Sequence, residues 1–268
     1  MLKFTKLSAT GNDFILFDNR QKILTGKEHD FFHQICQRRT GVGADGILLI
    51  EKSEKFNFSM RYYNSDGYLG EMCGNGARAS AFYACTQKIA GTELTFDVLG
   101  IPYRASVKND CVKLSMPPPV EIREYPAVLE EPAFKEGGYL NVGVPHYIIF
   151  VPDVELVDVQ NIGRKYRYHQ AFSPWGTNSN FVQLIDKNTI KIRTYERGVE
   201  EETLACGTGT ISAALLAHKQ KGLNPPFTVQ TKGGILRVDF DEKLAEIALE
   251  GQVKIVYFAE LNENAFLK

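Results

Sequence analysis

The sequence lacks the features that mark several large classes of protein. Its 268 residues carry a net charge of −1, and Lys and Arg are dispersed, which argues against nucleic acid or an anionic membrane as the main partner. It has no N-terminal signal pattern and no long apolar stretch, so we expect a soluble, cytoplasmic protein without a membrane partner. Its five cysteines, an odd number with no Cys-x-x-Cys spacing, resemble neither a disulfide framework nor a structural zinc site.

What the sequence does have is an internal repeat. Residues 73–81 and 206–214 both read Cys-Gly-x-Gly followed by an Ala-rich run, and their separation is 206 − 73 = 133 residues, almost half of the chain. At the same offset, residues 11–17 lie over 144–150, and residues 95–101 lie over 228–234. This period is too long for a solenoid. It predicts a duplicated domain with two lobes related by a pseudo-twofold axis, and a cleft between such lobes is a preferred ligand site.

The local patterns predict an α+β fold with mostly antiparallel sheet, because strand-like segments are close in sequence and helical segments are few. The expected strands are residues 2–7, 14–17, 47–50, 56–63, 94–98, 111–114, 146–151, 181–185, 190–195, 227–231, 236–240 and 245–249. The expected helices are residues 28–38, 74–88, 158–169 and 207–221. The three prolines at 117–119 cannot lie inside a sheet or a helix, so we expect the interdomain linker there.

The two repeated cysteines stand where a helix begins, and this position favours reactive thiols. The apolar, small residues that follow Cys73 and Cys206 predict central, buried helices. A helix N-terminus offers unpaired N–H groups and the positive end of a dipole, which bind a carboxylate and lower a thiol pKa. The neighbouring glycines let a ligand approach the backbone closely. One thiolate and one thiol could remove a proton from one face of an α-carbon and return one to the other, without a Schiff-base lysine.

The other cysteines have a simpler interpretation. A single cysteine at a helix start is more often a small buried hydrophobe, and this is our interpretation of Cys36, Cys85 and Cys111. For Cys73 and Cys206 the duplicated glycine-rich context favours catalysis instead. Two thiolates in one closed site would repel each other, so their titrations should split and belong to the pair.

With these motifs, the chain resembles the diaminopimelate epimerase family over essentially its whole length. The family's markers are residues 10–14 (TGNDF), 41–46 (GVGADG), 63–67 (YNSDG), 72–78 (MCGNGAR), 145–146 (PH), 177–180 (TNSN), 195–198 (YERG) and 205–209 (ACGTG). Each is weak alone, but in this order and spacing the set is strong. The resemblance implies a cofactor-independent enzyme that interconverts LL- and meso-diaminopimelate, in lysine and peptidoglycan precursor synthesis. It needs no metal.

The resemblance also implies an arrangement of domains. Each lobe would be a mostly antiparallel sheet or barrel wrapped around a central helix. The N-terminal lobe would comprise residues 1–117 and a C-terminal segment of about 258–268, the second lobe residues 118–257, and the active site the cleft between them. A homodimer is left open.

Roles for individual residues follow from the resemblance. Cys73 and Cys206 would be the base and the acid, exchanging roles with the direction of reaction, and His146 and Glu196 would tune them. The residues expected to bind the substrate, through side chains or backbone N–H groups, are Asn12, Asn64, Gly74, Asn75, Asn178, Glu196, Arg197, Gly207 and Thr208. An Arg suits a carboxylate, while Glu and Asn oxygens suit ammonium groups.

Each supporting residue also has a structural alternative. Asn64 could simply make a turn before Ser-Asp-Gly, and His146 could be a core histidine. Glu196 and Arg197 could be a solvated pair, and Asn178 a loop residue. It is their coincidence with the repeat around the cysteines that favours function.

The chain departs from the family's pattern at three places. Val144 stands where many members carry Asn, which removes a hydrogen bond to the non-reacting end of the substrate. Gly46 stands where some members carry Gln. The segment between Arg197 and Cys206 is one residue longer than in many relatives. The first and third departures bear on substrate contacts rather than on the chemistry.

Other functions fit parts of the pattern. A two-cysteine racemase or epimerase of the same fold could act on proline or hydroxyproline, although Glu196 and Arg197 suit a substrate with a second charged end. An isomerase of this fold that works with a carboxylate would not need both cysteines. The chain could also be a binding module or a thiol redox sensor. We expect a Cys73–Cys206 disulfide to form only as oxidative inactivation.

Overall fold

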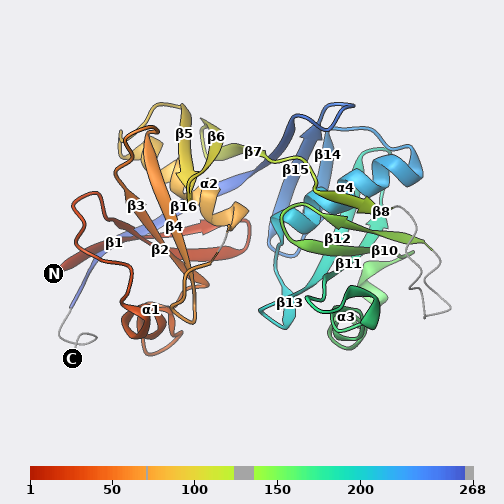
Figure 1. The fold of residues 1–268 in the computed structure, drawn as a ribbon, viewed down its shortest axis with the longest axis horizontal. Helices are drawn as coiled ribbons and strands as arrows, with labels where there is room; N and C mark the ends of the chain where they lie inside the picture. Colours follow the sequence, from red (N-terminus) through yellow and green to blue (C-terminus); the bar gives the residue numbers. More distant parts are fainter. Residues whose placement is uncertain (71, 124–135, 263–268) are drawn as a thin grey trace. The chain divides into compact units, whose positions relative to one another are not determined.

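The computed structural model describes residues 1–70, 72–123 and 136–262 of the chain. The chain divides into two compact units, residues 1–115 with 251–268 and residues 116–250, and Figure 1 shows both. Of the C-terminal segment expected in the first lobe, residues 263–268 lie outside the described part. No helix in the described part is long and apolar enough to span a membrane.

Unit 1 is an eight-stranded barrel. Its strands are β1 (Leu2–Ala9), β2 (Asn12–Asp18), β3 (Gly46–Glu51), β4 (Phe58–Asn64), β5 (Glu93–Val98), β6 (Ile101–Lys108), β7 (Cys111–Met116) and the long β16 (Ile247–Leu261). They neighbour one another in that order, and β16 also pairs antiparallel with β1, from Leu2 opposite Leu261 to Ala9 opposite Val253. This last pairing closes the barrel and leaves no open edge.

Unit 2 repeats this order of elements, with β8 and β13 added. Its strands are β8 (Glu121–Arg123), β9 (Gly137–Asn141), β10 (Pro145–Phe150), β11 (Asn178–Leu184), β12 (Thr189–Glu196), β13 (Glu201–Thr203), β14 (Phe227–Thr231) and β15 (Gly234–Phe240). The sheet runs β16-β15-β14-β12-β11-β10-β9-β8, with β13 added to β12. The two-unit α+β fold expected from the repeat is therefore confirmed.

The repeat is visible in how the helices connect the strands. Parallel pairs in the described part of the chain include β2 with β3, β4 with β5, β10 with β11, and β12 with β14. A parallel pair needs a crossover, and these crossovers hold α1 (His29–Cys36), α2 (Gly74–Thr86), α3 (Val159–Arg167) and α4 (Gly207–Lys221), respectively. Each cysteine motif therefore opens the second crossover helix of its unit.

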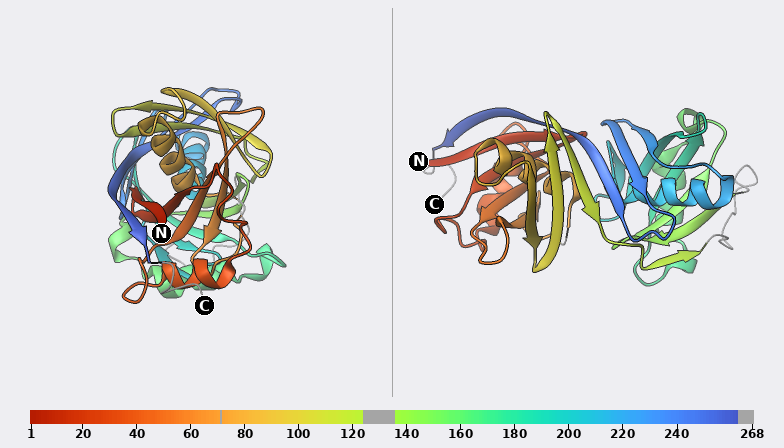
Figure 2. Two further views of the ribbon diagram at one scale, coloured as in Figure 1. Left: turned by 90° about the vertical axis from the view of Figure 1, so that its left-hand side faces the viewer. Right: turned by 90° about the horizontal axis from the view of Figure 1, so that it is seen from above.

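The helices α2 and α4 are the centres of their units, as the views of α2 in Figure 2 show. Their residues are buried on nearly every side, including Ala77, Ala79 and Ala81 in α2 and Ala213, Ala214 and Ala217 in α4, each fully buried. Small side chains allow the surrounding strands to approach the helix axis closely. A helix that is apolar all round is stable only when it is enclosed in this way.

The helices α1 and α3 cover separate hydrophobic clusters. In unit 1, Phe31, Phe32 and Ile35 of α1 pack with Ile47 and Leu49 of β3. In unit 2, Val159 and Tyr166 of α3 pack with aromatic residues of the strands such as Tyr147, Phe181 and Tyr195. Each unit therefore has one helix inside the sheet and one helix outside it.

All four predicted helices are present, but the strand predictions missed parts of the sheet. The strands β6, β8, β9, β13 and most of β16 were not expected. The buried side chains of β6 alternate with exposed ones and Pro102 interrupts its start, while β9 begins with two glycines. The prolines at 117–119 lie between β7 and β8, outside both strands.

Candidate active site

Cys73 is the N-cap of α2. Its backbone is extended (φ −123°, ψ 112°), and its Sγ accepts a hydrogen bond from the Gly76 N–H at 3.4 Å. The first helical bond runs from the Ala77 N–H to the Cys73 carbonyl at 2.8 Å. The N–H groups of Gly74 and Asn75 belong to the first turn, where a helix has no internal acceptors for them. The cysteine sulfur and these donors therefore share the positive end of one helix.

Hydrogen bonds between side-chain amides connect the N-terminus of α2 to β2. The Asn75 side chain is buried and donates to Oδ1 of Asn12, whose own Nδ2 donates to Asp45 at 3.0 Å. Asp45 also accepts from the Asp13 N–H at 3.2 Å. In unit 1 the structure thus brings together four of the predicted residues: Cys73, Gly74, Asn75 and Asn12. The Asn12 and Asn75 amides are used largely to position the helix.

Asn64 has the turn role that was its structural alternative. It is exposed at the end of β4, its N–H donates to the Tyr68 carbonyl, and its own carbonyl accepts from the Gly67 N–H, both at 2.9 Å. Its side chain stays exposed on this turn. The neighbouring Gly46 is explained by packing, since a Cβ there would lie 2.5 Å from the Tyr63 carbonyl oxygen and 2.6 Å from the Tyr62 ring.

Cys206 is the N-cap of α4 with nearly the same backbone (φ −119°, ψ 113°). Its Sγ lies 3.6 Å from the Thr208 hydroxyl, and that hydroxyl lies 2.9 Å from Nε2 of His146. His146 is fully buried at the start of β10. A chain of polar contacts therefore runs from the thiol through Thr208 to the imidazole.

Asn180 sets the tautomer of that imidazole. Its Oδ1 accepts from the Thr194 hydroxyl at 3.0 Å, and its Nδ2 lies 3.1 Å from the Tyr147 carbonyl, which fixes the orientation of the amide. The same Nδ2 lies 3.2 Å from Nδ1 of His146. Nδ1 is therefore the acceptor and Nε2 carries the proton, so His146 donates to Thr208 and leaves the threonine proton free for the sulfur.

His146 is held neutral. Burial lowers its pKa to about 3, and the positive charge of Arg197 reinforces this effect. The imidazole consequently acts on Cys206 through an oriented hydrogen bond and not as a cation. Removing the imidazole would take this hydrogen bond away from the partly buried Thr208 hydroxyl.

A second group of predicted residues surrounds Pro145. The buried Asn178 donates to the Pro145 carbonyl and accepts from the Arg197 N–H, both at 2.8 Å. Its amide therefore holds the ends of β10 and β12 together. Glu196 lies beside it on β12 and accepts from the Thr203 hydroxyl at 2.9 Å. The structure thus makes Asn178 a positioning residue for Arg197.

The Arg197 guanidinium borders a cavity of about 200 Å³ whose lining includes Asn141, Pro145, Phe172 and Trp175. Its Nη1 lies 3.4 Å from the Trp175 carbonyl oxygen. The chain after Arg197 makes a tight hairpin from β12 into β13, with φ of 91° at Gly198 and 61° at Glu200. The residue added before Cys206 lies in the segment that contains this hairpin.

The second glycine of the motif in unit 2 is required by packing, and that of the motif in unit 1 is closely packed. A Cβ on Gly76 would lie 3.0 Å from Leu48, and one on Gly209 would lie 2.5 Å from Oδ1 of Asn180 and 3.3 Å from the His146 ring. Real Cβ contacts below 3.0 Å essentially do not occur. The expectation that this glycine serves close approach of a ligand is therefore incomplete.

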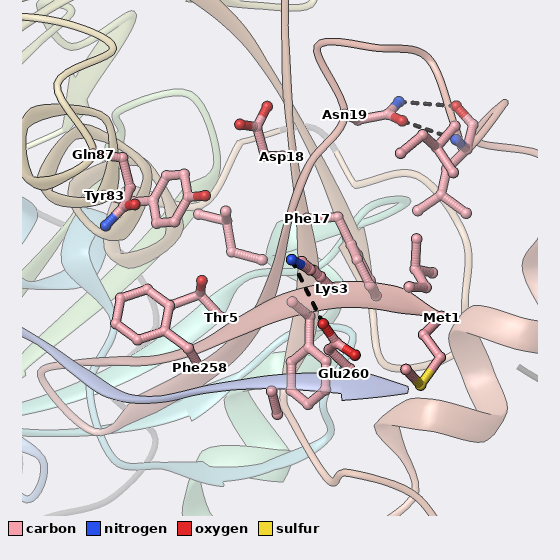
Figure 3. Close-up of a pocket in the computed structure, with 16 residues that line it drawn as sticks. Met1, Lys3, Thr5, Phe17, Asp18, Asn19, Tyr83, Gln87, Phe258 and Glu260 are labelled. Carbon is pink, nitrogen blue, oxygen red and sulfur yellow. Dashed lines mark hydrogen bonds and ion pairs between the residues drawn. The ribbon is translucent and has the colours of Figure 1, made fainter. Parts of the chain in front are cut away.

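A larger cavity, of about 680 Å³ in unit 1, is shown in Figure 3 and lies away from this chemistry. Its lining includes Tyr83 and Gln87, at the C-terminal end of α2, whereas Cys73 stands at the other end. Polar groups around the cavity pair with each other, as Lys3 does with Glu260.

None of the five cysteines, all of which the structure describes, forms a disulfide. Burial raises the pKa of Cys36 to about 12, in keeping with its interpretation as a buried hydrophobe. Within the described ranges, no group of three or more His, Cys, Asp or Glu side chains is placed to hold a metal ion.

The sequence analysis missed two residues in these networks, Asn180 and Arg78. Asn180 lies inside the TNSN segment but was not assigned a role. Arg78 closes the MCGNGAR segment, and its side chain is fully buried, which is rare for an arginine. The sequence carried a signal for each residue. Arg78 is a charged residue inside an Ala-rich helical pattern, and Asn180 is an amide residue inside a buried strand pattern.

Known proteins of one family are similar to this chain over nearly its whole length. A model of the family described as diaminopimelate epimerase matches residues 4–121 and 138–256. A diaminopimelate epimerase from Aquifex aeolicus is 40% identical, with 98% of each chain covered, and one from Archaeoglobus fulgidus is 39% identical, with 91% of each covered.

Solved structures show the same fold at low identity. A phenazine biosynthesis protein of the PhzF family from Bacillus anthracis is similar with a TM-score of 0.77 at 15% identity, covering 97% of this chain and 98% of the other. A probable proline racemase from Agrobacterium radiobacter is similar with a TM-score of 0.71 at 12% identity, covering 97% and 93%. At such identities the likeness shows the fold alone. The extent of the family match and the two cysteine-capped helices show that this chain belongs to the diaminopimelate epimerase family.

Proposed function

We propose that this protein interconverts LL- and meso-2,6-diaminopimelate by inverting one α-carbon with two thiols. The observation that carries the proposal is the pair of cysteines, each the N-cap of a buried central helix in its unit, in a chain of this family. The reaction would supply precursors of lysine and peptidoglycan.

The chemistry assigns one proton step to each cysteine. A thiolate, Cys73 in one direction, takes the α-proton, and the electron pair of the C–H bond moves into the carboxylate as an enediolate. A thiol, here Cys206, then delivers its proton to the opposite face and becomes the thiolate. The protons balance without a cofactor, and the next turnover runs in the other direction or after the thiols have exchanged protons with water.

The helix N-termini would supply the stabilisation that this carbanion needs. The N–H groups of Gly74 and Asn75 in α2, and of Gly207 and Thr208 in α4, belong to first turns without internal acceptors. Oriented donors of this kind stabilise charge as it develops on a carboxylate, usually the largest single contribution to such a reaction. They also favour the ionised form of a capping cysteine.

The distal end of the substrate would meet charged groups near β12. The Arg197 guanidinium suits the second carboxylate, and the Glu196 carboxylate suits the second ammonium group. Asn178 contributes by fixing the Arg197 backbone. Val144 offers no hydrogen bond at this end, so the proposal assigns more of the recognition to Arg197. The roles of Asn12 and Asn64 as direct ligands stay predictions, as do the cytoplasmic location and a homodimer.

The test is proton NMR of the purified, reduced protein with LL-diaminopimelate in D2O and no added cofactor. The proposal predicts loss of the α-proton signal together with appearance of the meso isomer. Absence of both, with folded protein and free thiols, would overturn it. L-proline and trans-4-hydroxy-L-proline in the same assay would then show whether the chain acts on a different amino acid.

A further inference from the structure

Among the residues that the structure describes, the positive charge of Arg78 has no carboxylate partner. Its side chain is fully buried, and Nη2 donates to the Thr10 hydroxyl at 3.2 Å and to Oδ1 of Asn75 at 2.5 Å. Both acceptors are neutral. Its Nε and Nη1 are buried and have no hydrogen-bond partner in the described part of the chain. Leaving charged donors buried and unsatisfied is costly, so the position calls for a further explanation.

The side chain of Arg78 extends toward the N-terminus of α2. Long side chains in a helix lean toward its N-terminus and lie over the preceding turn, which is why Arg78 reaches Asn75. Asn75 is the second residue of α2, and Cys73 is its N-cap. The guanidinium therefore lies beside the turn that Cys73 caps. Among the described residues, a negative charge on Cys73 or Cys111 would act on Arg78.

The other charges of this region are paired with each other. Asp13 on β2 accepts from Lys6 on β1 at 2.6 Å and from Arg38 at 2.8 Å, and Asp45 accepts from Arg38 at 2.7 Å. The carboxylates of Asp13 and Asp45 are thus paired with Lys6 and Arg38. Arg78 is not part of these ion pairs.

Further ionisable groups on the strands that pack against α2 do not provide a partner either. They are paired or neutral: Asp18 on β2 with Arg20, Glu51 on β3 with Arg61 on β4, and Tyr103 on β6, whose pKa is raised by burial. Between the two thiols, Cys73 is the one at a helix N-terminus, where a thiolate is favoured. The anion that would match Arg78 is therefore the thiolate of Cys73.

Unit 2 lacks this charge although it repeats the frame. At the offset of 133 residues, Asn75 corresponds to Thr208 and Arg78 to Ile211, which is 1% exposed. Thr208, like Asn75, ties the first turn to the neighbouring strand, through His146. His146 is neutral, because burial lowers its pKa to about 3. Its hydroxyl partner Thr208 can donate to a thiolate or accept from a thiol, so it serves Cys206 in either state.

We propose that Arg78 is a positioning residue whose buried charge makes Cys73, rather than Cys206, the thiolate of the resting protein. This inference rests on the proposed two-thiol function for its purpose. Burial lowers the pKa of Arg78 only to about 10, so the guanidinium stays charged near neutral pH. In the resting protein Cys73 is then the base and Cys206 the acid.

The test is the pH dependence of alkylation by iodoacetamide at each cysteine, measured by mass spectrometry without substrate. In the wild-type protein we expect the midpoint for Cys73 to lie at least about one pH unit below that for Cys206. Arg78→Met should raise the Cys73 midpoint by about one unit or more, and should lower its reactivity at pH 7 about tenfold. Arg78→Lys should restore most of this shift, because the charge is kept.

The matched control is Ile211→Met, the same side chain introduced at the equivalent position of α4, which should move neither midpoint. An unchanged Cys73 midpoint in folded Arg78→Met, or a wild-type Cys206 that ionises below Cys73, would overturn the proposal. Because no turnover is measured, these outcomes are independent of whether the protein epimerises diaminopimelate.

A second measurement covers the case in which Arg78→Met does not fold. A thiol whose pKa is lowered by folding adds stability that grows as the pH rises from its folded pKa to its unfolded pKa, and is lost as the pH falls again. The stability difference between wild type and Cys73→Ala should therefore increase with pH over this window, and more than the difference for Cys206→Ala. A flat difference for Cys73→Ala would contradict the proposal.

Discussion

Replacing Thr208 by valine tests the polar chain behind Cys206. Valine has nearly the shape of threonine but lacks the hydroxyl that accepts from Nε2 of His146 at 2.9 Å and lies 3.6 Å from the Cys206 sulfur. The imidazole is fully buried, so its N–H would lose its acceptor in a place that water does not reach. The sulfur would lose its neutral donor in the same step.

The magnitude follows from these two losses. A buried donor left without an acceptor costs about 1–3 kcal/mol of stability, and about 1 kcal/mol corresponds to roughly 2–4 °C in Tm for a chain of this size. A hydrogen bond to a charged group contributes about 1.5–3 kcal/mol. Losing one from the Cys206 thiolate should therefore lower kcat/KM roughly 10- to 100-fold.

The assays are calorimetric unfolding and α-proton exchange with diaminopimelate in D2O. Thr208→Ser keeps the hydroxyl and should restore most of both losses. Thr210→Val is the matched control, because it removes a hydroxyl from the same helix that donates only to the Cys206 carbonyl, and it should leave turnover near wild type. The reasoning is refuted if Thr208→Val melts and turns over like wild type, or if Thr210→Val is equally impaired.

Three further predictions concern the same residues. Cys73→Ala or Cys206→Ala should abolish epimerisation in the NMR assay while leaving the circular dichroism spectrum unchanged, and turnover above a few per cent of wild type in either would contradict the two-thiol scheme. Because the folded pKa of His146 is about 3 and its ordinary value 6.5, its contribution to stability is present above pH 6.5 and is lost as the pH falls. Between pH 7 and pH 5 the free energy of unfolding, measured with urea, should fall about 2 kcal/mol more for wild type than for His146→Gln. If the free energies of unfolding of the two proteins change with pH in parallel, this account is excluded. Gly209→Ala should destabilise by about 1–3 kcal/mol in the same urea assay, whereas Gly91→Ala, whose Cβ would meet nothing closer than 3.9 Å, should change little; equal effects would count against the packing argument.

The repeat made much of the fold predictable from the sequence. An offset of 133 residues placed α2 and α4 in register, because both are marked by a capping cysteine and small apolar residues. Strands whose outward side is polar were harder to predict. β16 continues from Ile247 to Leu261 past Gly251 and then through a half in which most side chains are exposed. A glycine inside a strand weakens the local pattern, so the length of this strand was not expected.

Some residues of the candidate site could likewise be predicted from the sequence, and others could not. Cys206, Thr208 and His146 could be proposed from motifs, and the structure joins them in one chain of contacts. The roles of Asn178 and Asn180 could not, because they depend on which strands lie side by side. β10 pairs in parallel with β11, with His146 opposite Asn178 and Ile148 opposite Asn180, and this pairing brings the Asn180 amide to the imidazole.

The duplication explains why the two cysteines need different neighbours. A repeated frame gives each thiol the same helix N-terminus and the same extended cap, so the frame alone cannot decide which one is ionised. A proton can pass from one face of a carbon to the other only if one thiol starts without it. The difference must come from positions where the repeats have diverged, and Arg78 against Ile211 is such a position close to a capping cysteine. The same logic predicts that an arginine introduced at 211 would erode the distinction between acid and base even though both cysteines remain.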